Sequence, residues 1–205
     1  MQVFLDDIAI EVDQPTLAAA LRAGVQRAQG LGRLVVEVQG DGRVLGQEAL
    51  VSPSKERDEY GEVRIMTASP GLLVRSTLSD ATEALVLVEA DQAEAAGQIQ
   101  RGELVEARKT LERAVQTWQA IMTALAHSAE LLSLDLGKMT VGEGGPSVGM
   151  CINQLIEQLK AMVVALSRED WSTLADSLEF DMAEQARTWK GVLACVMASV
   201  QAEEA

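Results

Sequence analysis

Helical periodicity in the last third of the chain constrains the fold most strongly. Apolar residues recur there every three or four positions, in two runs that a polar turn at residues 167–170 separates. The runs are Ile152, Leu155, Ile156, Leu159, Met162, Val163 and Leu166, and then Trp171, Ala175, Leu178, Met182, Ala186, Trp189, Leu193, Val196 and Val200. Each run predicts one face of an α-helix, and the short turn predicts antiparallel packing. Asp170 is predicted to cap the second helix.

A heptad pattern predicts another long helix over residues 104–132. Apolar side chains recur every seven positions, at Leu104, Leu111, Trp118, Leu125 and Leu132. Such a seam is typical of a coiled coil, so one hypothesis is a homo-oligomeric structural protein that pairs two copies along residues 104–132. We favour an ordinary helix inside an antiparallel bundle, because other long helices are available as partners.

A further helical pattern covers residues 72–99. Its apolar face is expected to hold Leu78, Ala81, Leu85, Val88 and Ile99. The run at residues 85–88 is apolar throughout, which is unusual for a solvated face. We expect that run to pack on two sides, against a sheet and against the bundle.

The first 68 residues follow a strand-like pattern. Residues 1–12 predict a hairpin that turns at Asp6-Asp7, and Asp13-Gln14-Pro15 predicts the start of a helix that ends at Gly30 and Gly32. The apolar face of this helix is expected to be Leu17, Ala20, Leu21, Val25 and Ala28. Residues 34–38, 43–45 and 62–67 predict three further strands, with a turn at residues 40–42 and a polar loop at 46–61.

The order of these elements predicts an α+β protein. Strand, strand, helix, strand, strand, loop and strand suit a β-grasp-like sheet crossed by one helix. We therefore expect a β-grasp-like domain at residues 1–68. A four- to five-helix antiparallel bundle is expected at residues 69–205.

Charge and hydropathy argue against two classes of partner. The chain has 31 acidic and 17 basic residues, a net charge of −14. Without a basic platform, binding to nucleic acid or to anionic membrane surfaces is not expected. No apolar run reaches the roughly 18 residues that span a membrane, and the N-terminus lacks the features of a signal peptide. These observations predict a cytoplasmic protein.

A glycine-rich segment at residues 135–149 contains the one motif that suggests catalysis. Residues 145–149, Gly-Pro-Ser-Val-Gly, match the G-x-S-x-G pattern of serine hydrolases, in which Ser147 would be the nucleophile. The rest of the pattern fails, because no strand leads directly into it and the single histidine, His127, precedes the serine. We keep a serine hydrolase as a remote alternative and favour a flexible or capping loop.

Other chemistry is not indicated. The segment lacks the lysine of a phosphate-binding loop, and the two cysteines and one histidine do not have zinc-site spacing. Cys151 and Cys195 are offset by roughly 13 Å along paired helices, which is too far for a disulfide. The carboxylates of the last helix avoid its apolar face. We predict no catalytic residue, no cofactor and no metal site.

Phe180 is the candidate for partner binding. It lies opposite the apolar stripe of the last helix, and Arg187 falls near it on that back face. An aromatic side chain in this position either packs elsewhere in the molecule, which we favour, or forms part of a binding site for another protein.

Residues 159–193 (LKAMVVALSREDWSTLADSLEFDMAEQARTWKGVL) resemble the last helical pair of a set of uncharacterised bacterial proteins. The strand-rich start of those proteins ends in a V-x-V-x-G-D-G-like turn, as Val36–Gly42 does here. The pair is also similar in texture to flagellin-export chaperones, which hold an aggregation-prone partner along a helical bundle. The strand-rich first part departs from those chaperones. The apolar helices and the missing active site predict a non-enzymatic adaptor or chaperone-like protein that binds another protein, and the resemblance implies a flagellum-associated context as one option.

Overall fold

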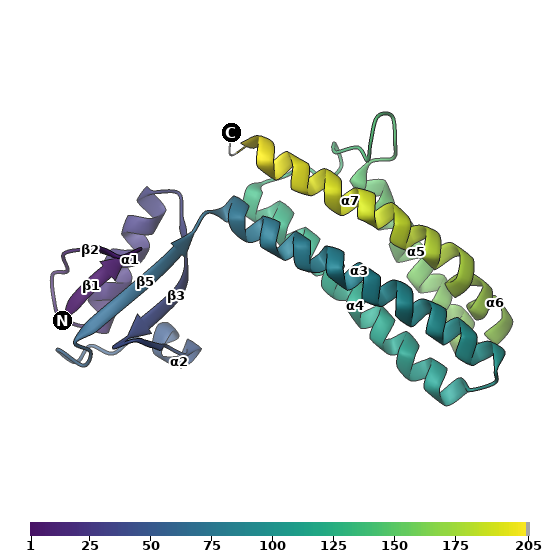
Figure 1. The fold of residues 1–205 in the computed structure, drawn as a ribbon, viewed down its shortest axis with the longest axis horizontal. Coiled ribbons are helices and arrows are strands. Elements are labelled where there is room, and N and C mark those ends of the chain that lie inside the picture. The colour runs from purple at the N-terminus through teal and green to yellow at the C-terminus, as the bar shows by residue number, and fades with distance from the viewer. Residues whose placement is uncertain (204–205) are drawn as a thin grey trace. The chain divides into compact units, whose positions relative to one another are not determined.

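The computed structural model describes residues 1–203, which form two compact units that divide between Leu73 and Val74. Over residues 1–203 a five-stranded sheet is followed by a set of long helices, so the predicted α+β class is confirmed (Figure 1). Each unit is described separately below.

The first unit is a mixed sheet crossed by one helix. Its strands are β1 (Gln2–Leu5), β2 (Ile8–Ala9), β3 (Leu34–Gly40), β4 (Arg43–Val44) and β5 (Glu62–Ala68). Their order is β2-β1-β5-β3-β4, and β1 and β5 pair in parallel whereas the other pairs are antiparallel. The helix α1 (Leu17–Gly30) packs on the sheet. This is the β-grasp topology that the order of elements predicts.

Both hairpin turns use residues in the left-handed region. Asp6 and Asp7 have φ of 46° and 64° between β1 and β2, and Asp41 and Gly42 have φ of 48° and 77° between β3 and β4. Two consecutive positive φ angles match the twist of the flanking strands, and Asp and Gly adopt them at low cost. The two predicted turns are thus confirmed.

Three local expectations in this unit are corrected. The helix begins at Leu17, after Thr16, whose hydroxyl accepts a hydrogen bond from the Ala19 N–H at 3.2 Å, and not at residues 13–15. The predicted loop at 46–61 contains a short helix, α2 (Gln47–Val51). Val25 is exposed, and Gly24 faces the sheet instead, so close that an added Cβ would lie 2.3 Å from Ile65 Cδ1.

The core of the first unit lies between α1 and the sheet. Its buried apolar side chains are Val3, Leu5, Leu17, Ala20, Val38, Val63 and Ile65. The alternation of β1 and β5 places these side chains on the α1 side, because successive residues of a strand point to opposite faces. This core is small, so polar contacts around it matter for stability.

Asp6 forms the most connected of these polar contacts. Its Oδ1 accepts the Thr67 backbone N–H at 2.8 Å, its Oδ2 accepts the Thr67 hydroxyl, and Arg33 Nε lies 3.4 Å from Oδ2. The hydrogen bond from the Thr67 hydroxyl is the main cause that lowers the pKa of Asp6 below its usual value. The folded state therefore gains stability above the unfolded pKa of about 4, and loses it as the pH falls through the lower folded pKa.

We expect Asp6→Asn to destabilise the first unit by about 1 kcal/mol at pH 7, because the charge-assisted hydrogen bonds are lost while asparagine still tolerates the positive φ. The difference from the native chain should shrink as the pH falls below about 4. Hydrogen exchange of the β1 and β5 amides measures this effect. Asp13→Asn, at an exposed carboxylate, is the control, and an equal effect of both substitutions would contradict the assignment.

The second unit is built from α3 (Pro70–Gln100), α4 (Leu104–Leu132), α5 (Val148–Ser167), α6 (Trp171–Asp176), a π-helical turn η1 (Ser177–Asp181) and α7 (Met182–Glu203). Figure 1 shows the long helices running side by side, α3 next to α4 and α7 next to α5. Salt bridges join α3 to α7 and to α4. Lys190 Nζ on α7 lies 2.8 Å from Glu89 on α3, and Arg113 on α4 pairs with Asp91 on α3.

The apolar stripe predicted over residues 171–200 forms part of the bundle core, whereas the stripe predicted over residues 152–166 does so only in part, because Val163 is 61% exposed. The stripe of the last two helices is buried from Ala175 to Val200, and Trp171 is half-buried. Trp118 and Trp189 meet edge to face, with ring centroids 5.5 Å apart. Asp170 caps α6 as predicted, because its Oδ1 accepts the Thr173 N–H at 3.1 Å. The seam residues Leu111 and Leu125 are buried in this same core.

Two expectations for the helices are wrong. The second helix of the last pair is not continuous, because the π-helical turn at Ser177–Asp181 interrupts it. In the run at residues 85–88, Leu85 and Val88 are buried, but Val86 is 59% exposed and Leu87 63%. Consecutive helical residues lie about 100° apart, so a four-residue run cannot face one core throughout.

Candidate functional site

The outer surface of the bundle carries an apolar groove between α4 and α5, with a volume of about 990 Å³. Apolar side chains from both helices line it: Leu111, Val115, Met122, Ile156, Leu159, Met162, Val163, Val164 and Leu166. Its polar lining consists of Arg108, Glu112, Gln116, Gln119 and Lys160. In the part of the chain that the structure describes, no further helix covers it.

The groove exists because α5 has two apolar faces. One face is buried in the bundle core and consists of Val148, Cys151, Leu155, Met162 and Ala165. The other includes Ile156 and Val163, each one residue further along the helix than a buried position and therefore rotated by about 100°, and the half-buried Leu159 lies between the two faces. Val163 is 61% exposed. The single apolar stripe predicted for this helix is thus split between a core face and a solvent face.

The charged residues around the groove already have partners. The Arg108 guanidinium lies 5.2 Å from the centre of the Trp171 ring, and its terminal nitrogen is 3.6 Å from Glu169. Lys160 Nζ pairs with Glu157 at 2.8 Å. Glu112 Oε1 accepts a hydrogen bond from the Gln116 side-chain amide at 3.4 Å. The remaining groove surface is apolar or amide-bearing, so the groove favours an apolar ligand surface rather than a charged small molecule.

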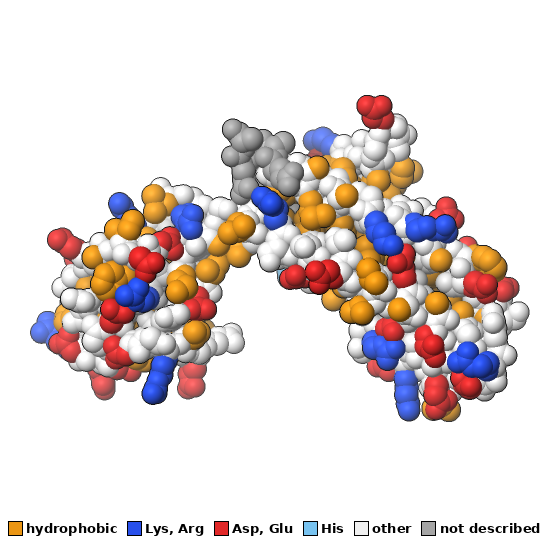
Figure 2. Space-filling model, viewed as in Figure 1, with side chains coloured by type: hydrophobic (Ala, Val, Ile, Leu, Met, Phe, Trp, Pro, Cys, Tyr) orange, Lys and Arg blue, Asp and Glu red, His pale blue; other side chains and the backbone are white. Residues whose placement is uncertain are grey.

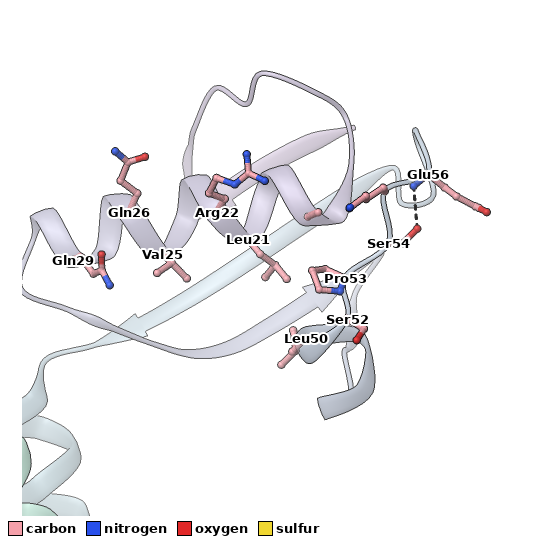
Figure 3. Close-up of a pocket in the computed structure, with 12 residues that line it drawn as sticks. Leu21, Arg22, Val25, Gln26, Gln29, Leu50, Ser52, Pro53, Ser54 and Glu56 are labelled. Carbon is pink, nitrogen blue, oxygen red and sulfur yellow. Dashed lines mark hydrogen bonds between the residues drawn. The ribbon is translucent and has the colours of Figure 1, made fainter.

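A second groove lies in the first unit, between α1 and the segment that includes α2 (Figure 3). Its volume is about 1200 Å³. Leu21 and Val25 point from α1 toward Leu50 and Pro53, whereas Arg22 points away. More than half of its lining residues are polar or charged: Arg22, Gln26, Gln29, Ser52, Ser54, Lys55 and Glu56. It is therefore a less continuous apolar surface than the α4–α5 groove.

Ser147 is a helix cap in this structure. Its hydroxyl accepts a hydrogen bond from the Met150 N–H at 3.2 Å and so caps α5. A nucleophile elbow requires a strand before the helix, but here Ser147 forms only an isolated antiparallel β-bridge with Thr140. His127 lies on the exposed side of α4. The local geometry favours the capping interpretation of the glycine-rich segment.

We expect Ser147→Ala to lower bundle stability by about 1 kcal/mol through loss of the cap, whereas Ser147→Asp, which can also cap, should retain most of it. Chemical denaturation followed by circular dichroism measures both. A serine-directed phosphonate should leave the native chain unlabelled at residue 147. Labelling that disappears in Ser147→Ala would instead support the hydrolase.

The glycine-rich segment is packed on the bundle. Leu136, Met139 and Val141 contact the core, and an added Cβ on Gly191 would lie 2.9 Å from Val141 Cγ1. The Cys195 thiol donates a hydrogen bond to the Thr140 carbonyl at 3.2 Å. These contacts attach the segment to α7, so the segment stabilises the bundle by packing against it.

The cysteines are separate. Cys151 is buried and Cys195 is partly exposed, and both are free thiols. Burial raises the pKa of the Cys151 thiol, which disfavours the reactive thiolate. Within residues 1–203, no three histidine, cysteine or carboxylate side chains come close enough to hold a metal ion.

Phe180 and Arg187 are not brought together in one site. Phe180 lies in the π-helical turn, is 63% exposed, and borders a pocket of about 330 Å³ that Ala161, Ala165 and Asp176 also line. Arg187 is exposed, does not line that pocket, and donates to the Ala183 carbonyl of its own helix at 3.3 Å. A partner-binding role for Phe180 and Arg187 stays a prediction.

The α4–α5 groove was not predicted from the sequence, although one signal was present. Residues 161–166, Ala-Met-Val-Val-Ala-Leu, are apolar throughout. A run of six apolar residues exceeds what one face of a helix can bury, so part of it has to face another surface.

The face of each unit that is visible in Figure 2 carries a mixture of acidic, basic and apolar side chains. This mixture is in line with surface ion pairs such as that of Lys190 with Glu89.

Among the helices within residues 1–203, none combines the length and the apolar character required to cross a bilayer.

The helical part of the chain has recognisable relatives. A family model described as Domain of unknown function (DUF8042) matches residues 76–192, which is more than half of the chain. The chain belongs to the DUF8042 family. Comparisons with curated proteins and with solved structures give no match. The DUF8042 match contains the α4–α5 groove, whereas the groove of Figure 3 lies outside it.

Proposed function

We propose that this DUF8042 protein is a non-enzymatic, cytoplasmic adaptor or chaperone-like protein that holds an amphipathic helix of another protein in the α4–α5 groove. The uncovered apolar lining of that groove carries the proposal. An apolar surface of this extent on a bundle is typical of a site for protein binding. It also lies within the part of the chain that defines the family.

The dimensions of the groove favour a helix as its occupant. The lining residues run from Arg108 to Met122 on α4 and from Ile156 to Leu166 on α5. At a rise of about 1.5 Å per residue, these stretches are roughly 21 Å and 15 Å long. A partner helix of about 10–14 residues fits this length and would present apolar anchors at i, i+3, i+4 and i+7.

Two apolar side chains in the groove offer contact sites for such anchors. Val163 and Val164 are both exposed, and Leu159 beside them is half-buried. Covering them with an apolar partner surface removes them from water, and this removal is the main source of binding free energy in grooves of this kind. The narrower form of the proposal, a flagellum-associated export chaperone, rests on the resemblance of residues 159–193 alone.

Site-specific crosslinking tests the proposal. A photo-crosslinking amino acid at position 163, in the groove, is compared with one at position 86, which is equally exposed on α3. The expected result is that position 163, but not position 86, captures one reproducible protein. The crosslink should lie in an amphipathic segment of that protein, and a synthetic peptide of this segment should bind the purified chain. Equal capture from both positions would overturn the proposal.

The same experiment separates the alternatives. Crosslinks between two copies of this chain, together with a dimer in light scattering, would support the homo-oligomeric protein instead. Such a dimer would have to use the groove rather than the seam at residues 104–132, because Leu111, Trp118 and Leu125 are buried in the bundle. Capture of flagellin would support the export-chaperone form.

A further inference from the structure

A small cleft lies between α3 and the π-helical turn at the start of α7, away from the α4–α5 groove. Its volume is about 260 Å³. Small residues form its apolar walls: Ala93, Ala96 and Gly97 on α3 and Ala183 on α7. A π-helical turn adds a residue to a helix and often accompanies a functional site. Here that turn contributes Leu178 and Glu179 to the cleft.

The decisive feature of the cleft is the amide of Gln92. This side chain lines the cleft and is only 2% exposed, and within the described residues neither its Oε1 nor its Nε2 has a hydrogen-bond partner. A buried amide without partners is costly, and natural proteins nearly always satisfy such groups. An apolar residue would be more stable at this position, so its amide points to a ligand that supplies the missing partners.

The charged residues around the cleft indicate which charge the ligand carries. Both oxygens of Glu89 accept from Lys190 Nζ at 2.8 Å, which neutralises this carboxylate. Glu179 is exposed, and its Oε2 accepts a hydrogen bond from the neutral amide of Gln100 at 3.2 Å. An amide does not neutralise a carboxylate, so the negative charge of Glu179 beside the cleft favours a cationic ligand.

We propose that the cleft binds a small organic cation that also carries a hydrogen-bond acceptor, such as the guanidinium and neighbouring carbonyl of an arginine residue. The cation donates to Glu179 and to Gln92 Oε1, and the carbonyl accepts from Gln92 Nε2. The alkyl stem packs on Ala93, Gly97 and Ala183, where larger side chains would close the cleft. The ligand could come from a partner protein's arginine or from a free arginine-like amine. This proposal is independent of the α4–α5 groove.

A matched pair of probes tests the charge requirement. N-acetyl-argininamide and N-acetyl-citrullinamide have nearly the same shape, but only the first is a cation. Titration of the ¹⁵N-labelled full chain is followed at the side-chain amide of Gln92, which the spectrum of Gln92→Leu assigns. We expect the arginine derivative to shift this signal and the neutral one to bind about tenfold more weakly or not at all.

Agmatine tests the acceptor, because it has the guanidinium without the amide carbonyl. We expect it to bind more weakly than N-acetyl-argininamide, and equally tight binding would contradict the contact between the carbonyl and Gln92 Nε2. Free arginine distinguishes the two sources: binding as tight as that of N-acetyl-argininamide favours a free amine, and weaker binding favours an arginine in a peptide. Failure of N-acetyl-argininamide to shift the Gln92 amide at millimolar concentrations would overturn the proposal.

Variants separate binding from structure. Gln92→Leu, which lacks the side-chain amide signal and is therefore titrated by isothermal calorimetry, should abolish binding while raising the denaturation midpoint, because an apolar side chain replaces an unpartnered amide. Glu179→Gln should weaken binding about tenfold with the fold intact, and Glu184→Gln, an exposed carboxylate on α7 that does not line the cleft, is the control. Retained binding in both Gln92→Leu and Glu179→Gln would show that Gln92 is only a core residue.

Discussion

Val163→Glu is expected to weaken binding of the partner helix by about 30-fold or more, because a charge in the centre of an apolar groove has to be desolvated when the partner covers it. The bundle itself should lose less than about 0.5 kcal/mol, because the Val163 side chain is mainly exposed in the free protein. Fluorescence anisotropy of the peptide identified by crosslinking measures the first effect, and urea denaturation the second.

Val86→Glu is the matched control for this prediction. Val86 is about as exposed as Val163, but it lies on α3, outside the groove. Substitution there adds the same negative charge to an already acidic chain and should leave the affinity unchanged. If both substitutions reduced the affinity equally, the loss would reflect overall charge, and the groove would not be the binding site.

Trp189→Ala is expected to destabilise the bundle by about 3–5 kcal/mol, the largest effect of a single substitution on stability that we predict. Trp189 is fully buried, and its ring meets that of Trp118 edge to face. Its indole N–H has no hydrogen-bond partner among the described residues, so the loss is one of packing and of the aromatic pair. Urea denaturation followed by far-ultraviolet circular dichroism measures it.

Trp171→Ala provides the comparison for the core tryptophan. Trp171 is half-buried and contacts the Arg108 guanidinium, which is 5.2 Å from its ring centre. Losing that contact should cost about 1 kcal/mol, since cation–π contacts at exposed sites are weak. A cost for Trp171→Ala that equals or exceeds the cost for Trp189→Ala would contradict the assignment of Trp189 to the centre of the core.

These two predictions separate the scaffold from the proposed site. The core tryptophans lie on the buried side of the bundle, whereas Val163 lies on its outer surface. A residue whose substitution changes stability but not affinity belongs to the scaffold. A residue whose substitution changes affinity but not stability belongs to the site. The free energy of unfolding and the affinity therefore have to be measured on the same variants.

Local patterns predicted much of the fold because they depend on neighbours in the chain. The Asp6-Asp7 and Asp41-Gly42 turns follow from the low cost of positive φ at these residues, and the helical stripes follow from a period of 3.6 residues. The α1 start was predicted too early because a proline suggested it, whereas Thr16 supplies the hydrogen bond that caps the helix. Where two local signals compete, the one that satisfies backbone groups decides.

The candidate sites could not be predicted in the same way. The sequence shows that Met162 and Val163 are both apolar, but only the packing of α5 on its neighbours decides that Met162 is buried and Val163 is not. Gln92 gives no signal in the sequence, because its missing partners become evident only when α3 and α7 enclose it. The π-helical turn that helps to form its cleft also lies in a segment whose periodicity reads as continuous helix.

The sequence by itself therefore determined the α+β class, the order of the strands and of the long helices, both hairpin turns and the apolar stripe from Ala175 to Val200. These depend on residue type and spacing, which act over a few positions of the chain. Only the tertiary structure decided which apolar faces remain open and which polar groups lack partners. Both properties depend on which helices pack together, and the physical reason is that burial depends on residues distant in sequence.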